Sequence, residues 1–205
     1  MDKGQLRRHF RKMLLDMDPQ QRVEKSKRVC RNLIQTPQFA NAGTIMVYLA
    51  MPIEVDTAEI ILYAWQAGKT VAAPKISWQQ RHMIPVEIKT LDTGFATEFG
   101  GLRNPTRGAP TPFAEIDLVI TPGLGFDHSG NRLGRGGSYY DRFFTSNKLN
   151  AVKCGLAFAE QVVDEITTNE TDVPLDMLVT DETVIYFNSD DKPGCVGKAV
   201  QRSTD

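Results

Sequence analysis

Cysteine and histidine are scarce in this sequence, which contains three of each among its 205 residues. Cys30, Cys154 and Cys195 are scattered along the chain, and no C-x-x-C pair occurs. Because zinc sites in proteins need closely spaced cysteine and histidine ligands, no zinc site is expected. Cys30 and Cys154 lie in apolar patterns, so we expect both thiols to be buried.

Long hydrophobic runs are also missing. The first residues, MDKGQLRRHFRK, are charged and lack the apolar stretch of a secretory signal. No apolar run approaches the length of a membrane-spanning helix. Together with the scattered cysteines, these absences favour a protein of the reducing cytoplasm that has no membrane partner.

The chain has no large excess of charge of one sign, since its formal net charge is -1 and its pI is about 6.3. Nucleic-acid-binding domains present strongly basic faces, so no nucleic-acid partner is expected. A local basic pocket for a small anion is compatible with this composition. The length suits one full core better than two, so we expect a single domain over residues 1–187. We also expect the protein to act as a monomer. Residues 188–205 lose the apolar pattern and predict a flexible tail.

Glycine, by contrast, is concentrated in one stretch, TPGLGFDHSGNRLGRGGSYYD, from Thr121 to Asp141. Six of the sixteen glycines lie between Gly123 and Gly137. Glycine is costly to order and offers nothing to pack, so a core does not need this concentration, whereas a backbone that bends around a ligand does. Residues 116–120 predict a strand before the loop, and residues 139–144 predict the start of a helix after it. A strand, a glycine loop and a helix start together direct backbone N–H groups at an anion.

Charged side chains in the same stretch favour a phosphate. Arg132 and Arg135 add positive charge, and Asp141 is a hard oxygen ligand suited to magnesium. Neither the P-loop pattern G-x-x-x-x-G-K-[ST] nor the dinucleotide pattern G-x-G-x-x-G occurs. A glycine-rich surface loop that merely connects two elements is the structural alternative.

Hydrophobic periodicity predicts an α/β protein. Helices are expected over residues 3–17, from an Asp18 N-cap to Gln35, and from Asp56 or Thr57 to a C-terminal Gly68. Strands are expected at 44–49, 70–73, 82–88 with Pro85 at an edge or a bulge, 116–120, 152–158, 176–180 and 184–187. The strand–helix–strand order over 44–73 is typical of a parallel sheet, in which ligands lie at the carboxyl ends of strands. Residues 89–115 are interpreted as a mobile loop that covers the substrate.

The stretch from Pro122 to Asp141 resembles the signature of the 5-formyltetrahydrofolate cyclo-ligases, also called methenyltetrahydrofolate synthetases: P-G-x-x-F-D-x-x-G-x-R-L-G-x-G-x-G-Y-Y-D. One position departs, because Ser138 stands where the family usually has the third glycine of G-x-G-x-G. A serine fits there without strain only at negative φ, and it bears on how closely the backbone can approach a nucleotide.

Three further blocks resemble the family in the right order, so the resemblance extends from Lys3 to about Thr180. They are KGQLR at the start, YLAMPIEVDT with GKTVAAP, and DVPLD at residues 172–176. Relatives commonly carry a histidine where this chain has Thr171, so any role of that imidazole is absent here.

The resemblance implies a three-layer α/β fold, Rossmann-like, with a mostly parallel sheet and helices on both faces, as in sugar-phosphate isomerases and CoA transferases. It implies ATP- and Mg2+-dependent cyclisation of 5-formyltetrahydrofolate to 5,10-methenyltetrahydrofolate, with release of ADP and phosphate. The implied intermediate is a formyl oxygen phosphorylated by ATP, an iminophosphate. Such chemistry needs alignment and charge neutralisation more than acid–base groups.

The resemblance also implies site residues. Arg135 and Tyr139 would be catalytic, and Asp141 would hold the metal. The implied ATP-binding residues are Lys3, Gly4, Gln5, Leu6, Arg7, Arg132, Leu133, Gly134, Arg135, Gly136, Gly137, Ser138, Tyr139 and Tyr140. The implied folate-binding residues are Leu49, Met51, Glu54, Arg135 and Tyr139. His82 and Met83 lie near the site in relatives.

Structural alternatives stand beside these assignments. A charged face on the first helix is commonly only solvated, Met51 could be simple core, and Glu54 could be a helix-dipole partner. Two other functions remain open: a non-catalytic or repurposed relative that binds a nucleotide or another heterocycle, and a sugar-phosphate isomerase or CoA-transferase-like protein. The last would need a catalytic glutamate or lysine and would consume no ATP. No G-x-S-x-G motif points to a nucleophilic triad.

Overall fold

The computed structural model describes residues 1–146 and 148–187. The predicted tail, residues 188–205, with Cys195, lies outside the described residues. Within the described part, no helix combines the length and the apolar character that crossing a membrane requires.

A seven-stranded sheet forms the centre of the described chain, in the order β12-β11-β9-β6-β1-β2-β3. The inner neighbours are parallel, whereas β3 and β12 pair antiparallel at the two edges. The strands are β1 (Thr44–Val47), β2 (Thr70–Ser77), β3 (His82–Glu87), β6 (Leu118–Thr121), β9 (Val152–Leu156), β11 (Met177–Val179) and β12 (Val184–Tyr186). The predicted mostly parallel sheet is confirmed.

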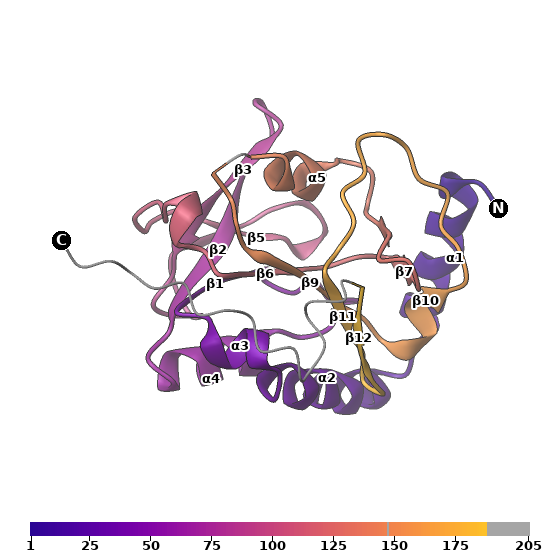
Figure 1. Cartoon of the computed structure of the whole chain (residues 1–205), viewed down its shortest axis with the longest axis horizontal. Helices are drawn as coiled ribbons and strands as arrows, with labels where there is room; N and C mark the ends of the chain where they lie inside the picture. The colour runs from indigo at the N-terminus through magenta and orange to yellow at the C-terminus, as the bar shows by residue number, and fades with distance from the viewer. Residues whose placement is uncertain (147, 188–205) are drawn as a thin grey trace.

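Helices cover both faces of this sheet (Figure 1), which gives the predicted three layers. The α-helices are α1 (Lys3–Asp16), α2 (Pro19–Ile34), α3 (Pro37–Asn41), α4 (Ala58–Gln66) and α5 (Tyr139–Phe144). In Figure 1, α2, α3 and α4 lie below the sheet, α5 lies above it, and α1 stands at one side near β7 and β10. Asp18 caps α2, since its carboxylate accepts from the backbone N–H groups of Gln20 and Gln21.

Strand β1 is apolar throughout because both of its faces are covered. Ile45 and Val47 belong to the hydrophobic cluster that contains the α2 and α4 side chains. Met46, between them, points to the opposite face and packs in the cluster that contains Phe143 of α5. Strand residues alternate between faces, so a continuous apolar run is what a sheet covered on both sides requires.

The connections contain more structure than the sequence predicted. A small sheet is formed by β10 (Val162–Val163), β7 (Gly125–Asp127) and β8 (Arg132–Leu133). The expected single bend between β6 and α5 is therefore wrong, because the β7–β8 hairpin interrupts it. Residues 89–115, expected as a loop, contain the antiparallel pair β4 (Phe95–Thr97) and β5 (Arg103–Pro105), with 3-10 turns at η1 (Phe99–Gly101) and η2 (Phe113–Glu115). A third 3-10 turn, η3 (Ala159–Gln161), precedes β10.

The outer edge of β3 is covered by the chain just before η2. Thr111 donates its backbone N–H to the Pro85 carbonyl oxygen at 2.9 Å, and the Glu87 N–H reaches the Ala109 carbonyl oxygen at 2.9 Å. Pro85 thus lies on an edge strand, as predicted, where its missing N–H removes no bond to an inner strand. Residues 109–111 are referred to below as the strap.

Candidate functional site

The glycine-rich stretch divides into two halves with different surroundings. Residues 122–133, here called the packed half, build β7 and β8 against α1. A Cβ on Gly125 would stand 2.3 Å from the Phe10 ring, and one on Gly123 would stand 2.5 Å from the Phe126 ring. The interpretation that a core has no need of these glycines is wrong at both positions, because two aromatic rings occupy the space a side chain would take.

Asp127 organises the turn of the packed half. Its carboxylate is buried, with the residue 1% exposed. It accepts hydrogen bonds from the backbone N–H groups of Ser129, Asn131 and Ile166 and from the Asn131 side chain, at 2.9 to 3.0 Å. This acid therefore holds the hairpin and the chain after β10 together, and it is a structural group.

Residues 134–141, here called the exposed half, form a loop and the first turn of α5. Arg135, Gly136, Gly137 and Ser138 are all exposed. Gly136 has φ of 107°, which only glycine adopts easily, and Ser138 has φ of 48° and ψ of 30°. The serine is therefore left-handed, contrary to the negative φ that would let it fit without strain, at a cost of about 1 kcal/mol.

Helix α1 brings two of the predicted basic residues to this loop. Arg7 Nε donates to the Gly134 carbonyl oxygen at 2.9 Å. Lys3 Nζ lies 2.5 Å from Asp172 Oδ2, in the loop that follows β10. The helix begins with a capping box in which the Asp2 carboxylate accepts from Gln5 N–H, and the Gln5 side chain accepts from Asp2 N–H.

Two predicted nucleotide-binding residues point elsewhere. Leu6, 8% exposed, and Leu133, 1% exposed, both pack in the main hydrophobic core. Any contact that they make with a ligand must use the backbone, as must any contact of Gly4 at the start of α1. The sequence predicted these three residues as nucleotide-binding without saying which atoms would bind. In the structure, only their main-chain atoms are available to a nucleotide.

Arg132 lies beneath the exposed half, with only 5% of its side chain exposed. Its Nη2 donates to Asp141 Oδ1 at 3.1 Å, its Nη1 donates to the Pro122 carbonyl oxygen at 3.4 Å, and its guanidinium lies 5.4 Å from the Tyr140 ring centre. Its Nε is buried and has no hydrogen-bond partner among the described residues. A buried, partly unsatisfied guanidinium is suited to receive an anion.

Asp141 fits a magnesium ion that is held mainly by other groups. Its Oδ1 accepts from Arg132, and 13% of the side chain is exposed. The described residues include no group of three or more His, Cys, Asp or Glu side chains placed to hold a metal ion. Mg2+ usually keeps several waters and is bound through one or two carboxylates plus substrate phosphates, so a single carboxylate here is chemically adequate.

Burial raises the pKa of one phenol at the site and of two thiols in the core. Desolvation raises the pKa of the Tyr140 phenol well above its ordinary value, although the Arg132 charge acts in the opposite direction. Burial also raises the pKa of the Cys30 thiol to about 11 and that of Cys154 further. These thiols are buried, as predicted, and they stay protonated at neutral pH, so they are not nucleophiles.

The predicted folate residues and the glycine loop meet at one ion pair. Arg135 donates to Glu54 Oε1 from both Nη2, at 2.8 Å, and Nε, at 3.1 Å. Glu54 Oε2 accepts from the backbone N–H of Met51 at 2.9 Å. Leu49, by contrast, is buried in the main core. The structure therefore joins Glu54 and Arg135 directly, across 81 positions of sequence.

The segment 99–101 lies against the same turn. A Cβ on Gly100 would stand 2.8 Å from Met51 Cε, and one on Gly101 would stand 3.5 Å from Pro52 Cδ. Gly100 has φ of 73°. The positive φ accounts for glycine at position 100, and the close approach places part of the 89–115 segment over Met51.

Sequence reasoning missed Trp78 and Arg142, which both contact Tyr139. The Trp78 and Tyr139 rings meet edge to face with centres 5.7 Å apart, and the Arg142 guanidinium lies 5.2 Å from the centre of the Tyr139 ring. Trp78 is 53% exposed and donates its indole N–H to Glu98. A tryptophan in the turn between two predicted strands was the available signal, because a large aromatic side chain that stays exposed marks a candidate interaction site.

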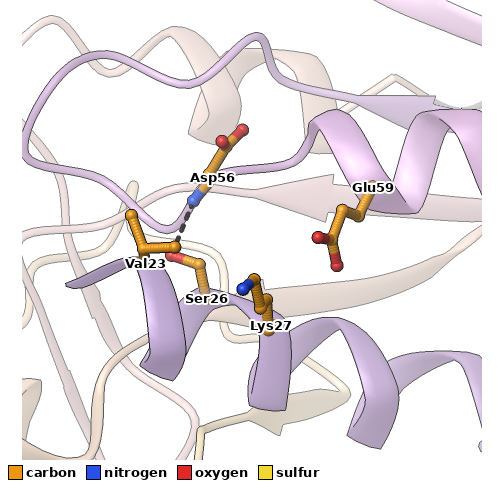
Figure 2. A pocket seen from close by; sticks show the side chains of 5 residues that line it. All are labelled: Val23, Ser26, Lys27, Asp56 and Glu59. Atoms are coloured by element: carbon orange, nitrogen blue, oxygen red, sulfur yellow. Dashed lines mark hydrogen bonds between the residues drawn. The ribbon is translucent and has the colours of Figure 1, made fainter. Parts of the chain in front are cut away.

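A surface hollow of about 270 Å³ lies beside Tyr139, between β3 and α5. Its lining residues are His82, Met83, Ile84, Phe113, Tyr139, Arg142, Phe143 and Ser146. Figure 2 shows a different hollow, between α2 and the start of α4, where the Asp56 N–H donates to Ser26 Oγ. That second hollow has a volume of only about 40 Å³, too small for a nucleotide or a pterin.

Comparisons with known proteins agree on one family. A family model described as the 5-formyltetrahydrofolate cyclo-ligase family matches residues 1–181. The 5-formyltetrahydrofolate cyclo-ligase of Mus musculus is 28% identical over 189 residues, which are 87% of this chain and 93% of the mouse protein. A probable 5-formyltetrahydrofolate cyclo-ligase of Schizosaccharomyces pombe is 30% identical over 173 residues, 77% of this chain and 84% of the yeast protein.

A solved structure shows the same fold. The 5,10-methenyltetrahydrofolate synthetase of Aquifex aeolicus superposes with a TM-score of 0.80 at 24% identity, and the match covers 98% of this chain and 97% of that one. The agreement extends over the central sheet and its helices, which confirms the α/β architecture expected from the sequence.

Proposed function

The chain belongs to the 5-formyltetrahydrofolate cyclo-ligase family, and we propose that it converts 5-formyltetrahydrofolate to 5,10-methenyltetrahydrofolate with ATP and Mg2+, releasing ADP and phosphate. The observation that carries this proposal is the ion pair between Glu54 and Arg135. It joins a carboxylate suited to the donor edge of a pterin to an arginine suited to phosphate, as a reaction between two bound substrates requires.

The chemistry follows from the poor leaving-group ability of a formamide oxygen. That oxygen attacks the γ-phosphorus of ATP, the bond from this phosphorus to the β–γ bridging oxygen breaks, and ADP departs. N10 then attacks the formyl carbon, the carbon–oxygen bond breaks with loss of phosphate, and the N10 proton is released. Positioning and charge neutralisation provide most of the catalysis in phosphoryl transfer.

Positive charge for the phosphates would come from two elements. Lys3 and Arg7 lie one turn apart on α1, and Arg132 and Arg135 lie in and below the loop. Each already has a protein acceptor: Asp172, the Gly134 carbonyl, Asp141 and Glu54, respectively. Binding a phosphate therefore exchanges partners: before the nucleotide arrives, carboxylates neutralise Lys3, Arg132 and Arg135, and a carbonyl accepts from Arg7.

The exposed half of the glycine stretch supplies the rest of the nucleotide site in this proposal. The backbone N–H groups of Gly134, Gly136 and Gly137 would face the phosphates. Tyr139 would bound the pocket on the side of Trp78. Asp141 would hold magnesium, which would shield phosphate charge when bound and orient the γ-phosphoryl group.

The folate would lie on the turn that follows β1. Glu54 presents a carboxylate, and a pterin's amino group and ring N–H are adjacent donors that match it. Met51 is partly exposed beside it and would contact the ring face, whereas Leu49 lies in the core and would support the turn from below. The 99–101 segment over Met51 would cover the bound ring.

A second candidate function is binding without turnover. The left-handed Ser138, at a position where the family usually has glycine, is the specific observation that favours it, because a side chain there can keep the nucleotide from its closest approach. The sugar-phosphate isomerase alternative has no comparable observation in its favour.

The deciding experiment is a direct assay. Purified protein is incubated with 5-formyltetrahydrofolate, Mg2+ and ATP, and the methenyl chromophore is followed by absorbance. We expect product only when both ATP and Mg2+ are present, with one ADP released per ring closed. Tight nucleotide binding without any chromophore would favour the repurposed relative instead.

A further inference from the structure

We infer that Glu54 and Arg135 form a latch between the nucleotide site and the folate site, so that each substrate strengthens the binding of the other. The inference rests on the proposed function, because it takes ATP and 5-formyltetrahydrofolate as the two ligands. The latch is the ion pair in which both Arg135 Nη2 and Nε donate to a single oxygen, Glu54 Oε1.

Glu54 is the fixed half of the latch. Its side chain is only 8% exposed. Its other oxygen, Oε2, accepts from Met51 N–H at 2.9 Å, and its own N–H donates to the Met51 carbonyl oxygen at 3.0 Å. Because the carboxylate is tied to the turn that carries it, it cannot follow the arginine when the latch opens.

Arg135 is the movable half. Its side chain is 35% exposed, and it stands between Gly134 and Gly136 in the exposed half of the glycine stretch. A long side chain on a glycine-flanked loop can turn towards a phosphate without moving a strand or a helix. Opening therefore consists of rotating Arg135 away from a stationary carboxylate.

Both ligands compete with the latch itself. A pterin that donates to Glu54 Oε1 takes the oxygen that Arg135 now occupies, and a phosphate that binds Arg135 takes the guanidinium. ATP alone would leave a largely buried carboxylate without its cation, which is costly. Folate alone would leave Arg135 without its acid.

With both ligands present, each freed group has a new partner and the latch is opened only once. The free energy of opening, which either ligand alone must overcome, is then shared by the two. By linkage the strengthening is reciprocal, and coupling free energies of this kind usually change affinity by about 5- to 150-fold.

The latch is specific to Arg135 among the four predicted phosphate-binding cations. Lys3 pairs with Asp172, Arg132 pairs with Asp141, and Arg7 donates to a backbone carbonyl. None of these acceptors belongs to the predicted folate-binding residues. Displacing those contacts affects the nucleotide only, so they do not couple the two sites.

Calorimetry on the full chain tests the coupling. The probes are 5-formyltetrahydrofolate and a non-hydrolysable ATP analogue with Mg2+, each titrated alone and then into protein saturated with the other. We expect each Kd to fall by about tenfold or more in the presence of the other ligand, by the same factor in both directions. Raised salt should reduce the factor, because Arg135 is partly exposed.

The variant Glu54→Gln separates the latch from other sources of coupling. The glutamine keeps an acceptor for Met51 N–H but removes the charge that holds Arg135. We expect the variant to bind the ATP analogue alone more tightly than the wild type, and its coupling factor to fall towards one. Glu160→Gln is the matched control, because Glu160 pairs with Lys25 at 2.8 Å and is 45% exposed. Circular dichroism checks the fold of both variants.

The outcomes are distinguishable. Independent binding of the two ligands to the wild type would overturn the latch and leave the proposed function standing. Coupling that persists in Glu54→Gln, or nucleotide binding by that variant no tighter than the wild type, would also overturn the latch. Failure of the wild type to bind either probe would instead remove the proposed function.

Discussion

The packed and exposed halves of the glycine-rich stretch use the same residue for opposite purposes. Gly125 in the packed half is small because the Phe10 ring fills the space beside it. Gly136 in the exposed half has φ of 107° and lies in a loop open to solvent. Contiguous sequence therefore contains two kinds of constraint, one on the stability of the fold and one on the site. Substitutions in the two halves should separate into two classes of effect.

The largest expected effect comes from a substitution in the exposed half that should impair activity. Arg135→Ala removes a cation that would face the transferring phosphoryl group, so kcat/KM should fall about 1,000-fold, the lower range for an arginine in this role. The free energy of unfolding should also fall, because the variant leaves the largely buried Glu54 carboxylate without its cation, although the exposed position of Arg135 lets water offset part of that loss. Activity is measured by methenyl absorbance and stability by urea denaturation.

Arg31→Ala is the matched control for that variant. Arg31 is an exposed arginine in the last turn of α2, so its removal should change neither activity nor stability appreciably. Wild-type ATP-dependent cyclisation by Arg135→Ala would contradict the role assigned to Arg135.

The next largest effect comes from a substitution in the packed half that should lower stability and leave activity unchanged. Gly125→Ala places a methyl group where the Phe10 ring now lies, and overpacking of this kind costs about 3 kcal/mol. The urea midpoint should fall, while kcat of the remaining folded protein should stay near the wild-type value. Gly43→Ala is the control, since a Cβ there would meet Asp117 Oδ2 at an ordinary 3.5 Å. Equal midpoints for the two variants would refute the packing argument.

The loss of stability at alkaline pH tests whether Tyr140, in the exposed half, is buried as deeply as the groups of the core. Burial raises the pKa of Tyr140 above its ordinary value, as it raises the pKa of Cys30 from 9.0 to about 11 in the core. In the unfolded chain these groups ionise earlier, so the native state binds more protons between about pH 9 and 11. Stability should therefore be complete below pH 9 and fall above it, with Cys30 alone contributing a loss of about 2 kcal/mol near pH 11.

Tyr140→Phe tests the contribution of the phenol to this loss. The ring and its packing are retained, so the melting temperature at pH 7 should stay close to that of the wild type. Between pH 9 and 11 the variant should lose less stability than the wild type. Identical alkaline losses in the two proteins would show that Tyr140 is less buried in solution than its position indicates.

The smallest effect concerns the strained serine. Ser138→Gly relieves a left-handed backbone, and the gain of about 1 kcal/mol is partly offset by the greater freedom of glycine in the unfolded chain. The KM for ATP should fall modestly if the serine side chain limits phosphate approach. Ser138→Ala is the control, because alanine keeps the strain and should improve neither quantity. A gain with alanine would point to the hydroxyl rather than to the backbone.

The sequence predicted the parts of the fold that depend on local patterns. Apolar periodicity located α1, α2, α4 and the strands of the central sheet, and Asp18 with Pro19 marked the start of α2 correctly. Helix α3 was missed because the helix expected from Asp18 was ended at Gln35 with no further helix after it, whereas Thr36 caps a new short helix. The hairpin β7–β8 was missed because β8 is only two residues long and because β7 also pairs with β10, which is distant in sequence.

The candidate site was predicted as a set of residues but not as an arrangement. The resemblance named Glu54 for the folate and Arg135 for both ligands, but only the three-dimensional structure shows the two side chains in contact, because they are 81 positions apart in sequence. The apolar stripe of the first helix indicates that Leu6 is buried, but the family motifs alone do not show that Leu133 and Leu49 are buried. The left-handed backbone of Ser138 depends on the loop around it, so the identity of this residue alone does not predict its φ.

The strap over β3 has a consequence for handling the protein. At this edge, residues 109–111 occupy the backbone groups of Pro85 and Glu87 that would otherwise be open to a strand from another molecule. Conditions that loosen the strap, such as mild heating or a cut in a surface loop nearby, would expose the unpaired backbone groups at the outer edge of β3. Precipitation into intermolecular β-structure should then begin at this side of the sheet, before the core itself has melted.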